Sequence, residues 1–256
     1  MIALNPNLDI RLAASPADIR AAQRLRYTVF VEELGGDGPL VDHSARLEAD
    51  AHDANYDHLM LIDRVREAQG QDAVIGVYRL MPGDRGQKHG FYCAGEYDLG
   101  PLTRSGRRVL ELGRSCIHPD YRGGSAMYVM WQALARYIQE RGIDILFGVA
   151  SFHGTDVAAL APTLSLLHDR HLAPKDLRVR AVEDAYQPMN LVPPAQIDRR
   201  AAMAQVPALI KAYLRLGGFV GDGAYVDHAF NTTDVCLILD VARMDPRSRE
   251  IYQGPA

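Results

Sequence analysis

The run from Val109 to Gly142 constrains the fold more than any other part of the chain. Residues 109–117 are mostly apolar, which predicts a buried strand, and a turn with a Gly-Gly pair follows at 123–124. Beyond the turn, apolar residues recur at one spacing: Met127, Met130, Trp131, Leu134 and Ile138. This i, i+3, i+4, i+7 spacing predicts a helix with one buried face, and Gly142 is the residue expected to end it.

Further strands and helices alternate along the chain. The β-branched segment 143–149 predicts a strand buried on both faces. The apolar runs 59–65 and 74–80, joined by a polar turn around Gly70, predict a β-hairpin. The other predicted elements are strands at 9–12 and 234–241 and helices that begin at Pro16, Thr155 and Pro207. Together they predict an α/β (α+β) fold, with a mixed central sheet flanked by helices.

Composition narrows the function classes. The 256 residues are 48% hydrophobic, which predicts one domain over 1–256 with an insertion around the Pro-rich segment 170–205. The net charge of −4 provides no global basic field for nucleic acid. No apolar stretch approaches the ~20 residues of a membrane helix. Three scattered cysteines without a signal sequence predict a reducing cytoplasm, and the chain lacks metal-ligand motifs such as CxxC and HExxH.

Two charged residues, Glu111 and Arg114, interrupt the apolar strand. On a regular strand, residues three apart face opposite sides of the sheet, so one of them should point toward the core or a cleft. A buried charge is costly unless it is paired, which makes both residues candidates for chemistry. A structural ion pair or a position at the sheet edge is the alternative reading, and these residues alone do not decide it.

The turn after this strand contains Arg122, Gly123, Gly124 and Ser125 and leads into the helix. Helix N-termini present free N–H groups to anions, and glycines permit close approach of the backbone. An anion-binding turn is therefore one interpretation. A plain connection between strand and helix is the other.

An acidic run contains Glu48, Asp50 and Asp53, and Arg79 lies on a predicted central strand. The carboxylates could hold a cationic substrate or, although their spacing does not match a metal motif, a metal ion. A solvated acidic loop is the usual explanation of such a run. Ser151, His153 and Asp156 are residue types of a nucleophilic triad, but no GxSxG motif surrounds the serine.

Four motifs occur in a fixed order: Arg24-Leu-Arg26-Tyr27-x-Val29-Phe30-x-x-Glu33, Glu48-x-Asp50-x-x-Asp53, Gly76-x-x-Arg79-Leu80 and Glu111-x-Gly113-Arg114. In order and spacing they resemble the autoinducer (acyl-homoserine lactone) synthases, which are acyltransferases of GNAT-like fold. The blocks FYCAGEYDL, LELGRSCIHPDYR, LFGVASFHGTD, YLRLGGFVGDGAYVD and FNTTDVC resemble the L-ornithine N-acyltransferases of bacterial ornithine-lipid synthesis. The resemblance extends from about Arg24 to Leu239.

This resemblance implies a GNAT-like acyl-CoA N-acyltransferase fold. It also implies transfer of a 3-hydroxyacyl chain from acyl carrier protein to the α-amino group of L-ornithine, which forms lyso-ornithine lipid. No separate cofactor is expected, because the donor is carried on the phosphopantetheine of the carrier protein. The expected partners are that carrier and ornithine in the cytoplasm, with peripheral contact at the inner membrane left open.

The candidate roles follow from that reaction. Glu111 is the first choice as general base, and Asp50 or Asp53 is the competing choice or could hold the cationic side chain of ornithine. Arg114 would orient Glu111 or pair with the loop 48–53. Arg122 and the backbone of 123–125 would take the single phosphate of the donor arm.

Ser125 departs from the usual GNAT pattern, in which a glycine at this place helps to cradle the pyrophosphate of coenzyme A. This difference favours a carrier-protein donor. Because carrier proteins are acidic, they need a basic patch, and Arg104, Arg107 and Arg108 form the densest one in the sequence. The alternative functions are an acyl-homoserine lactone synthase, an N-acyltransferase for another amino acid, a hydrolase using Ser151, or a non-catalytic module that binds the carrier protein.

Overall fold

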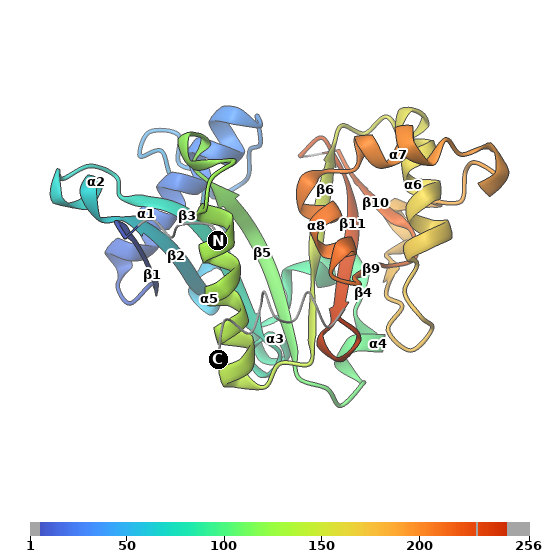
Figure 1. Cartoon of the computed structure of the whole chain (residues 1–256), viewed down its shortest axis with the longest axis horizontal. Coiled ribbons are helices and arrows are strands. Elements are labelled where there is room, and N and C mark those ends of the chain that lie inside the picture. Colours follow the sequence, from blue (N-terminus) through green and yellow to red (C-terminus); the bar gives the residue numbers. More distant parts are fainter. Residues whose placement is uncertain (1–5, 229, 245–256) are drawn as a thin grey trace. The chain divides into compact units, whose positions relative to one another are not determined.

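The computed structural model describes residues 6–228 and 230–244. These residues form two compact units (Figure 1). Unit 1 contains residues up to Met81 and residues 112–142, and unit 2 contains residues 82–111 and those from Ile143 onward. The strand β5 (Val109–Ile117) supplies residues to both units. One domain over 1–256 therefore stays a prediction.

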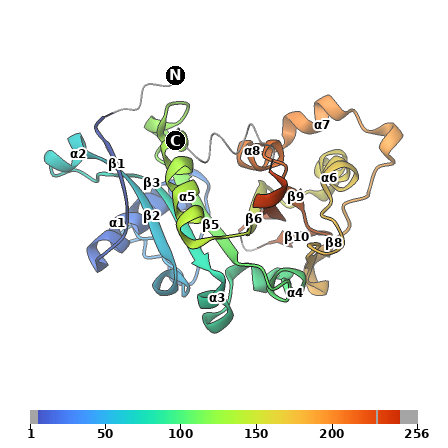
Figure 2. The same cartoon turned by 60° about the horizontal axis from the view of Figure 1, so that its bottom comes forward.

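Unit 1 is a sheet with strand order β1-β2-β3-β5 that is covered on both faces by helices (Figure 2). Its strands are β1 (Leu8–Leu12), β2 (Asp57–Asp63), β3 (Val74–Pro82) and the 112–117 part of β5. Its helices are α1 (Pro16–Arg26), which continues into a π-helix (Tyr27–Glu33), the short α2 (Arg64–Ala68) and α5 (Ala126–Arg141). The first three strands pair antiparallel, which confirms the predicted hairpin.

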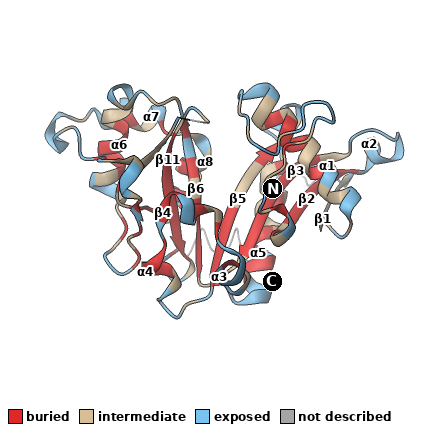
Figure 3. Ribbon diagram, turned by 180° about the vertical axis from the view of Figure 1, so that it is seen from behind, coloured by how far each residue is buried: buried red, intermediate tan, exposed pale blue. Residues whose placement is uncertain are grey.

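Alternation along β2 and β3 sends neighbouring side chains to opposite faces of this sheet. Met60 and Val77, which pair across the two strands, are buried in one cluster with residues of α1. Leu61 and Gly76 pair next to them, and a Cβ atom on Gly76 would lie 3.5 Å from the Met130 sulfur of α5. Both faces are therefore covered by apolar side chains, and both strands are almost entirely buried (Figure 3).

Unit 2 is built around β6 (Ile145–His153), which pairs antiparallel with β11 (Thr232–Asp240). On its other side β6 runs parallel to residues 109–111 of β5. The other strands are β4 (Tyr97–Asp98), β7 (Arg180–Ala181), β8 (Tyr186–Gln187), β9 (Phe219–Val220) and β10 (Ala224–Asp227). The helices are α3 (Gly83–His89), α4 (Gly100–Thr103), α6 (Val157–His171), α7 (Arg199–Gln205) and α8 (Ala208–Arg215).

The central strand and helix have the predicted bounds. β5 spans Val109–Ile117, α5 ends at Arg141, and Gly142 has the left-handed φ of 58° expected of a C′ residue. The assumption of a regular strand through Glu111 and Arg114 is wrong, because Arg114 has a φ of 49°. Within the described ranges, no helix has the length and apolar character needed to cross a bilayer.

Candidate active site

A cluster of buried charges lies on the α1 face of the unit 1 sheet. Its three arginines come from three elements: Arg26 from α1, Arg79 from β3 and Arg114 from β5. Its three carboxylates come from the segment before β2: Glu48 and Asp50 lie in a loop, and Asp53 begins a 3-10 helix (Asp53–Asn55). The sequence motifs that were far apart along the chain therefore meet at one place. We call these six residues the charged cluster.

Asp53 is the centre of the charged cluster. Its Oδ1 accepts hydrogen bonds from Arg26 Nη1 at 2.5 Å and from Arg79 Nη1 at 2.9 Å. Its Oδ2 accepts a further bond from Gln23 Nε2 at 2.8 Å. Arg26 also pairs with Glu48. Because the side chains of Arg26 and Arg79 are almost fully excluded from solvent, these partners offset the cost of burying two positive charges.

Asp50 and Arg114 form the accessible edge of the charged cluster. Asp50 Oδ2 accepts from Arg79 Nη1 at 2.5 Å, and it lies 3.4 Å from Arg114 Nη2. Arg114 Nε donates to Glu48 Oε1 at 3.1 Å. The side chains of Asp50 and Arg114 are 18% and 17% exposed, against at most 7% for the other members. A solute would meet this edge, with one negative and one positive group, before any other part of the cluster.

The arginines keep Asp50 and Asp53 ionised. Burial by itself would raise the pKa of Asp53, but Arg26 and Arg79 outweigh it and hold that pKa well below its ordinary value. Burial also opposes ionisation of Asp50, and Arg79 and Arg114 lower its pKa in the same way. A carboxylate with a depressed pKa is a weak proton acceptor, so this geometry favours a binding role for both residues over the competing role of general base.

The depressed pKa values of Asp50 and Asp53 predict a loss of stability in acid. Their stabilising contribution is complete above the ~3.9 of an unfolded aspartate and is lost as pH falls through the lower folded values. We expect the free energy of unfolding in urea to fall more steeply between about pH 6 and about pH 2.5 in the wild type than in Asp50→Asn, which lacks one titrating group. Parallel curves would contradict this origin.

Sequence reasoning singled out Arg79 and Arg114 but gave Arg26 no role. A signal was present, since Ala22, Leu25, Arg26 and Val29 follow the i, i+3, i+4, i+7 spacing of a buried helix face. His58, which the sequence places beside the acidic run, lies next to the charged cluster: its Nε2 is 3.0 Å from the carbonyl oxygen of Asp53, and burial lowers its pKa.

Glu111 lies in unit 2 and is 1% exposed. Its carboxylate accepts hydrogen bonds from the backbone N–H of Tyr92 at 3.1 Å and of Cys93 at 2.6 Å. Both donors belong to a short 3-10 helix, Tyr92–Gly95, that follows α3. The backbone therefore fixes the orientation of this carboxylate. Its role as general base stays a prediction.

In the turn before α5, Arg122 was predicted to bind the donor phosphate, but its guanidinium is paired with a carboxylate. Its guanidinium donates two hydrogen bonds to the carboxylate of Glu33, at 2.5 and 2.6 Å, and a third to the carbonyl oxygen of Ile117 at 3.1 Å. Gly123 has the left-handed φ of 76°, and Ser125 occupies the N-cap position of α5 without a side-chain cap bond. A donor phosphate at Arg122 would have to compete with Glu33, and phosphate binding by 122–125 stays a prediction.

The residues of the alternative triad lie on β6 and at the start of α6. Ser151 and His153 lie on β6, and Asp156 Oδ1 caps α6 by accepting from the N–H of Ala159 at 3.1 Å. The carboxylate of Asp156 is thus engaged with the helix that it begins. This arrangement gives the hydrolase alternative no support.

Comparison with known proteins identifies the family. Residues 25–132 match the acetyltransferase (GNAT) domain, a segment that contains every predicted site residue. The chain is 58% identical to the L-ornithine N(alpha)-acyltransferase of Rhodobacter capsulatus, over 98% of this chain and 97% of that protein. It is 42% identical to the enzyme of the same name from Brucella abortus, over 98% of this chain and 90% of that protein.

Solved structures show the same fold at low sequence identity. FeeM, an N-acyl amino acid synthase from uncultured soil microbes, matches with a TM-score of 0.51 and 12% identity over 93% of each chain. TofI, solved in a ternary complex with an inhibitor and MTA, matches with a TM-score of 0.51 and 17% identity over 97% of each chain. With the fold and near full-length relatives in agreement, this chain is an acyltransferase of GNAT-like fold and belongs to the L-ornithine N(alpha)-acyltransferase family.

Proposed function

We propose that the protein transfers a 3-hydroxyacyl chain from acyl carrier protein to the α-amino group of L-ornithine, forming lyso-ornithine lipid. The assignment of ornithine as the acyl acceptor rests on the name shared by relatives at 58% and 42% identity over nearly the whole chain. The same reaction places the protein in lipid biosynthesis. The assignment of acyl carrier protein as the donor rests on the resemblance of the sequence to the L-ornithine N-acyltransferases. It also rests on Ser125, which stands where a coenzyme A-binding turn would have a glycine.

The accessible edge of the charged cluster suits the acceptor. Ornithine carries an α-carboxylate and a cationic side chain at opposite ends. Arg114 would bind the carboxylate through a charge-assisted hydrogen bond, and Asp50 would bind the side-chain ammonium. The buried arginines behind them hold this edge in place before the substrate arrives, which lowers the entropic cost of binding.

The chemistry requires no covalent enzyme intermediate. The neutral amine attacks the thioester carbonyl, a C–N bond forms, the C–S bond breaks, and the proton lost by the amine balances the proton gained by the thiol. An α-amino group titrates near ~8, so a modest base suffices to remove its proton. We assign this task to Glu111, directly or through one water. Backbone N–H groups after Arg114 would stabilise the negative charge that develops on the carbonyl oxygen.

Product analysis tests this function. Purified protein is mixed with 3-hydroxyacyl carrier protein and, separately, ornithine, lysine or S-adenosylmethionine, and products are identified by mass. Acylated ornithine is the expected product. A product only with S-adenosylmethionine would indicate a lactone synthase, a product only with lysine would indicate another amino acid acceptor, and no product with any amine would indicate a non-catalytic module.

Asp50→Asn is expected to raise the KM for ornithine by about 10–100-fold, the cost of about 1.5–3 kcal/mol for losing a charged hydrogen bond. Steady-state kinetics with saturating donor measures it. Asp72→Asn is the matched control, because Asp72 makes an exposed ion pair with Arg24 on the same unit. An unchanged KM in Asp50→Asn, with the same melting temperature as the control, would remove Asp50 from the acceptor site.

A further inference from the structure

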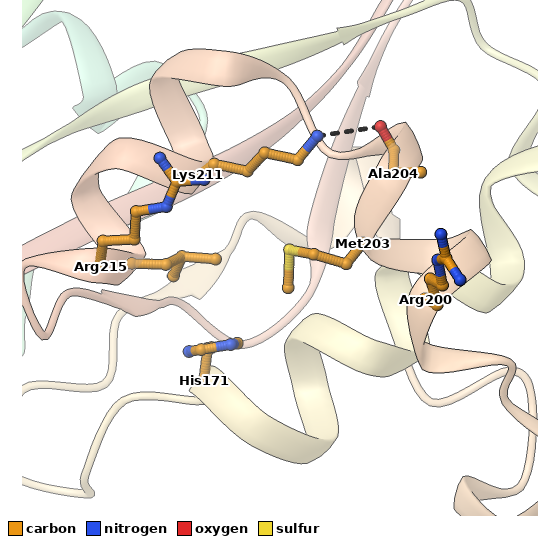
Figure 4. Close-up of a pocket in the computed structure, with 7 residues that line it drawn as sticks. His171, Arg200, Met203, Ala204, Lys211 and Arg215 are labelled. Carbon is orange, nitrogen blue, oxygen red and sulfur yellow. Dashed lines mark hydrogen bonds between the residues drawn. The ribbon is translucent and has the colours of Figure 1, made fainter.

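Unit 2 contains a hollow of about 560 Å³ that the candidate active site does not use (Figure 4). It lies where the end of α6 meets α7 and α8. Its lining consists of His171, Arg200, Met203, Ala204, Lys211, Leu214 and Arg215. We call this feature the α7–α8 basic hollow.

Helical spacing brings these residues together. Arg200, Met203 and Ala204 are at i, i+3 and i+4 on α7, so they share one face of that helix. The same spacing recurs on α8, where Lys211, Leu214 and Arg215 are its members. On α8 the apolar Leu214 therefore lies between the cations Lys211 and Arg215, and on α7 the apolar Met203 lies next to one cation, Arg200. The two faces are tied by a hydrogen bond of 2.9 Å from Lys211 Nζ to the Ala204 carbonyl oxygen.

The hollow carries positive charge that its own surroundings do not neutralise. Residues 199–221 contain four arginines and lysines and no Asp or Glu, although the whole chain has a net charge of −4. Of the two flanking carboxylates, Asp198 accepts from the backbone N–H of Arg200 at 3.0 Å, and Asp222 pairs with Arg180. Among the residues that the structure describes, no carboxylate lies within ion-pair distance of Arg200, Lys211 or Arg215. By contrast, Arg107 of the basic cluster noted in the sequence donates to Asp240 Oδ2 at 2.9 Å.

We infer that the α7–α8 basic hollow is the docking surface for the acidic acyl carrier protein that delivers the donor, an inference that rests on the proposed function. Arg200, Lys211 and Arg215 would face carboxylates of the carrier, and an apolar side chain of the carrier would enter between Met203 and Leu214. Such an arrangement, with cations around an apolar centre, is typical of protein interfaces.

The shape favours a protein partner over a membrane surface. Peripheral membrane segments bury protruding apolar side chains among lipid tails. Here the apolar residues line a hollow, and Leu214 is only 9% exposed. The hollow is not lined by any of the large apolar side chains that are exposed among the described residues, which are Leu34, Leu40, Val65 and Leu191.

A triple charge reversal, Arg200→Glu, Lys211→Glu and Arg215→Glu, tests this inference. The KM for 3-hydroxyacyl carrier protein is expected to rise at least about 10-fold, with the KM for ornithine unchanged, because charges at an interface rim act mainly on association. The wild-type KM for the carrier should also rise with salt more steeply than that of the variant, because screening weakens the attraction. The control is Arg20→Glu, Lys88→Glu and Arg136→Glu, which makes the same change in net charge at exposed positions.

The outcomes separate docking from the proposed function. If the wild type transfers the acyl chain and both triple variants have the same KM for the carrier, the docking inference is wrong and the function stands. If the wild type forms no acylated ornithine from 3-hydroxyacyl carrier protein, the proposed function is wrong, whatever the two triple variants show. Cosedimentation with phosphatidylglycerol vesicles provides the third outcome: loss of vesicle binding in the first triple variant, with an unchanged KM for the carrier, would assign the hollow to the membrane.

Discussion

Glu111→Gln is expected to lower turnover by about 10²–10⁴-fold, the contribution typical of a general base. The substitution preserves size and removes basicity. It also replaces one carboxylate oxygen with an NH2 group that faces a backbone N–H of Tyr92 or Cys93. The lost acceptor should cost about 1–3 kcal/mol of stability, which a protein of ordinary stability tolerates. Single-turnover acyl transfer and thermal melting measure the two effects separately.

Asp63→Ala is the matched control for the structural part of this effect, because it too removes a side-chain acceptor of backbone N–H bonds. Asp63 Oδ1 also accepts backbone N–H bonds, from Val65 at 2.8 Å and Arg66 at 3.4 Å, at the start of α2. Loss of this N-cap should cost about 0.5–2 kcal/mol of stability, and the variant should retain turnover. If Glu111→Gln retains near-normal turnover, or if both variants lose the same fraction of it, Glu111 is an anchor for the 3-10 helix at 92–95 and not the base.

Arg26→Met should lower the free energy of unfolding by about 3–5 kcal/mol, because it deprives two buried carboxylates of one of their two arginine partners. Glu48 and Asp53 both contact Arg26, whose side chain is 0% exposed. Urea titration at neutral pH measures the loss. The methionine fills a similar volume, so the change reports mainly on charge.

Arg24→Met provides the matched comparison on the same helix. Arg24 pairs with Asp72 at 2.8 Å, but both side chains are exposed, at 41% and 64%. An exposed ion pair contributes at most about 1 kcal/mol, so this variant should be close to the wild type. Equal losses in the two variants would mean that burial does not decide the energetics of the charged cluster.

Much of the fold could be predicted from the sequence, in those segments where a local pattern of apolar residues determines the secondary structure. The bounds of β5 and the end of α5 at Gly142 follow from an apolar run, a helical stripe and a left-handed glycine, all of which are local signals. The π-helix at 27–33 was not predictable, because its apolar residues continue the stripe of α1 and the sequence does not mark the change in hydrogen bonding. Segment 170–205 contains the end of α6, the two-residue strands β7 and β8, and α7. The two strands pair with β4 and β10, which are distant in the sequence.

The candidate site was predictable as a set of residues but not as a set of contacts. The motifs contain all six members of the charged cluster, and every one of them except Arg26 received a candidate role from the sequence. Which carboxylate meets which arginine depends on the register of β2 and β3 and on the left-handed φ of Arg114, which no local pattern encodes. The pairing of Arg122 with Glu33 was missed for the same reason.

The equal count of opposite charges in the charged cluster limits how this enzyme can diverge. Replacing any one of the four buried members, Arg26, Glu48, Asp53 or Arg79, by a neutral residue leaves an odd charge in a dry environment. If one of these residues is substituted during evolution, its charged partner must therefore be substituted at almost the same time, or water must enter the space beside the remaining charge. Directed-evolution libraries that randomise these positions in complementary pairs should yield many more folded clones than libraries that randomise them singly.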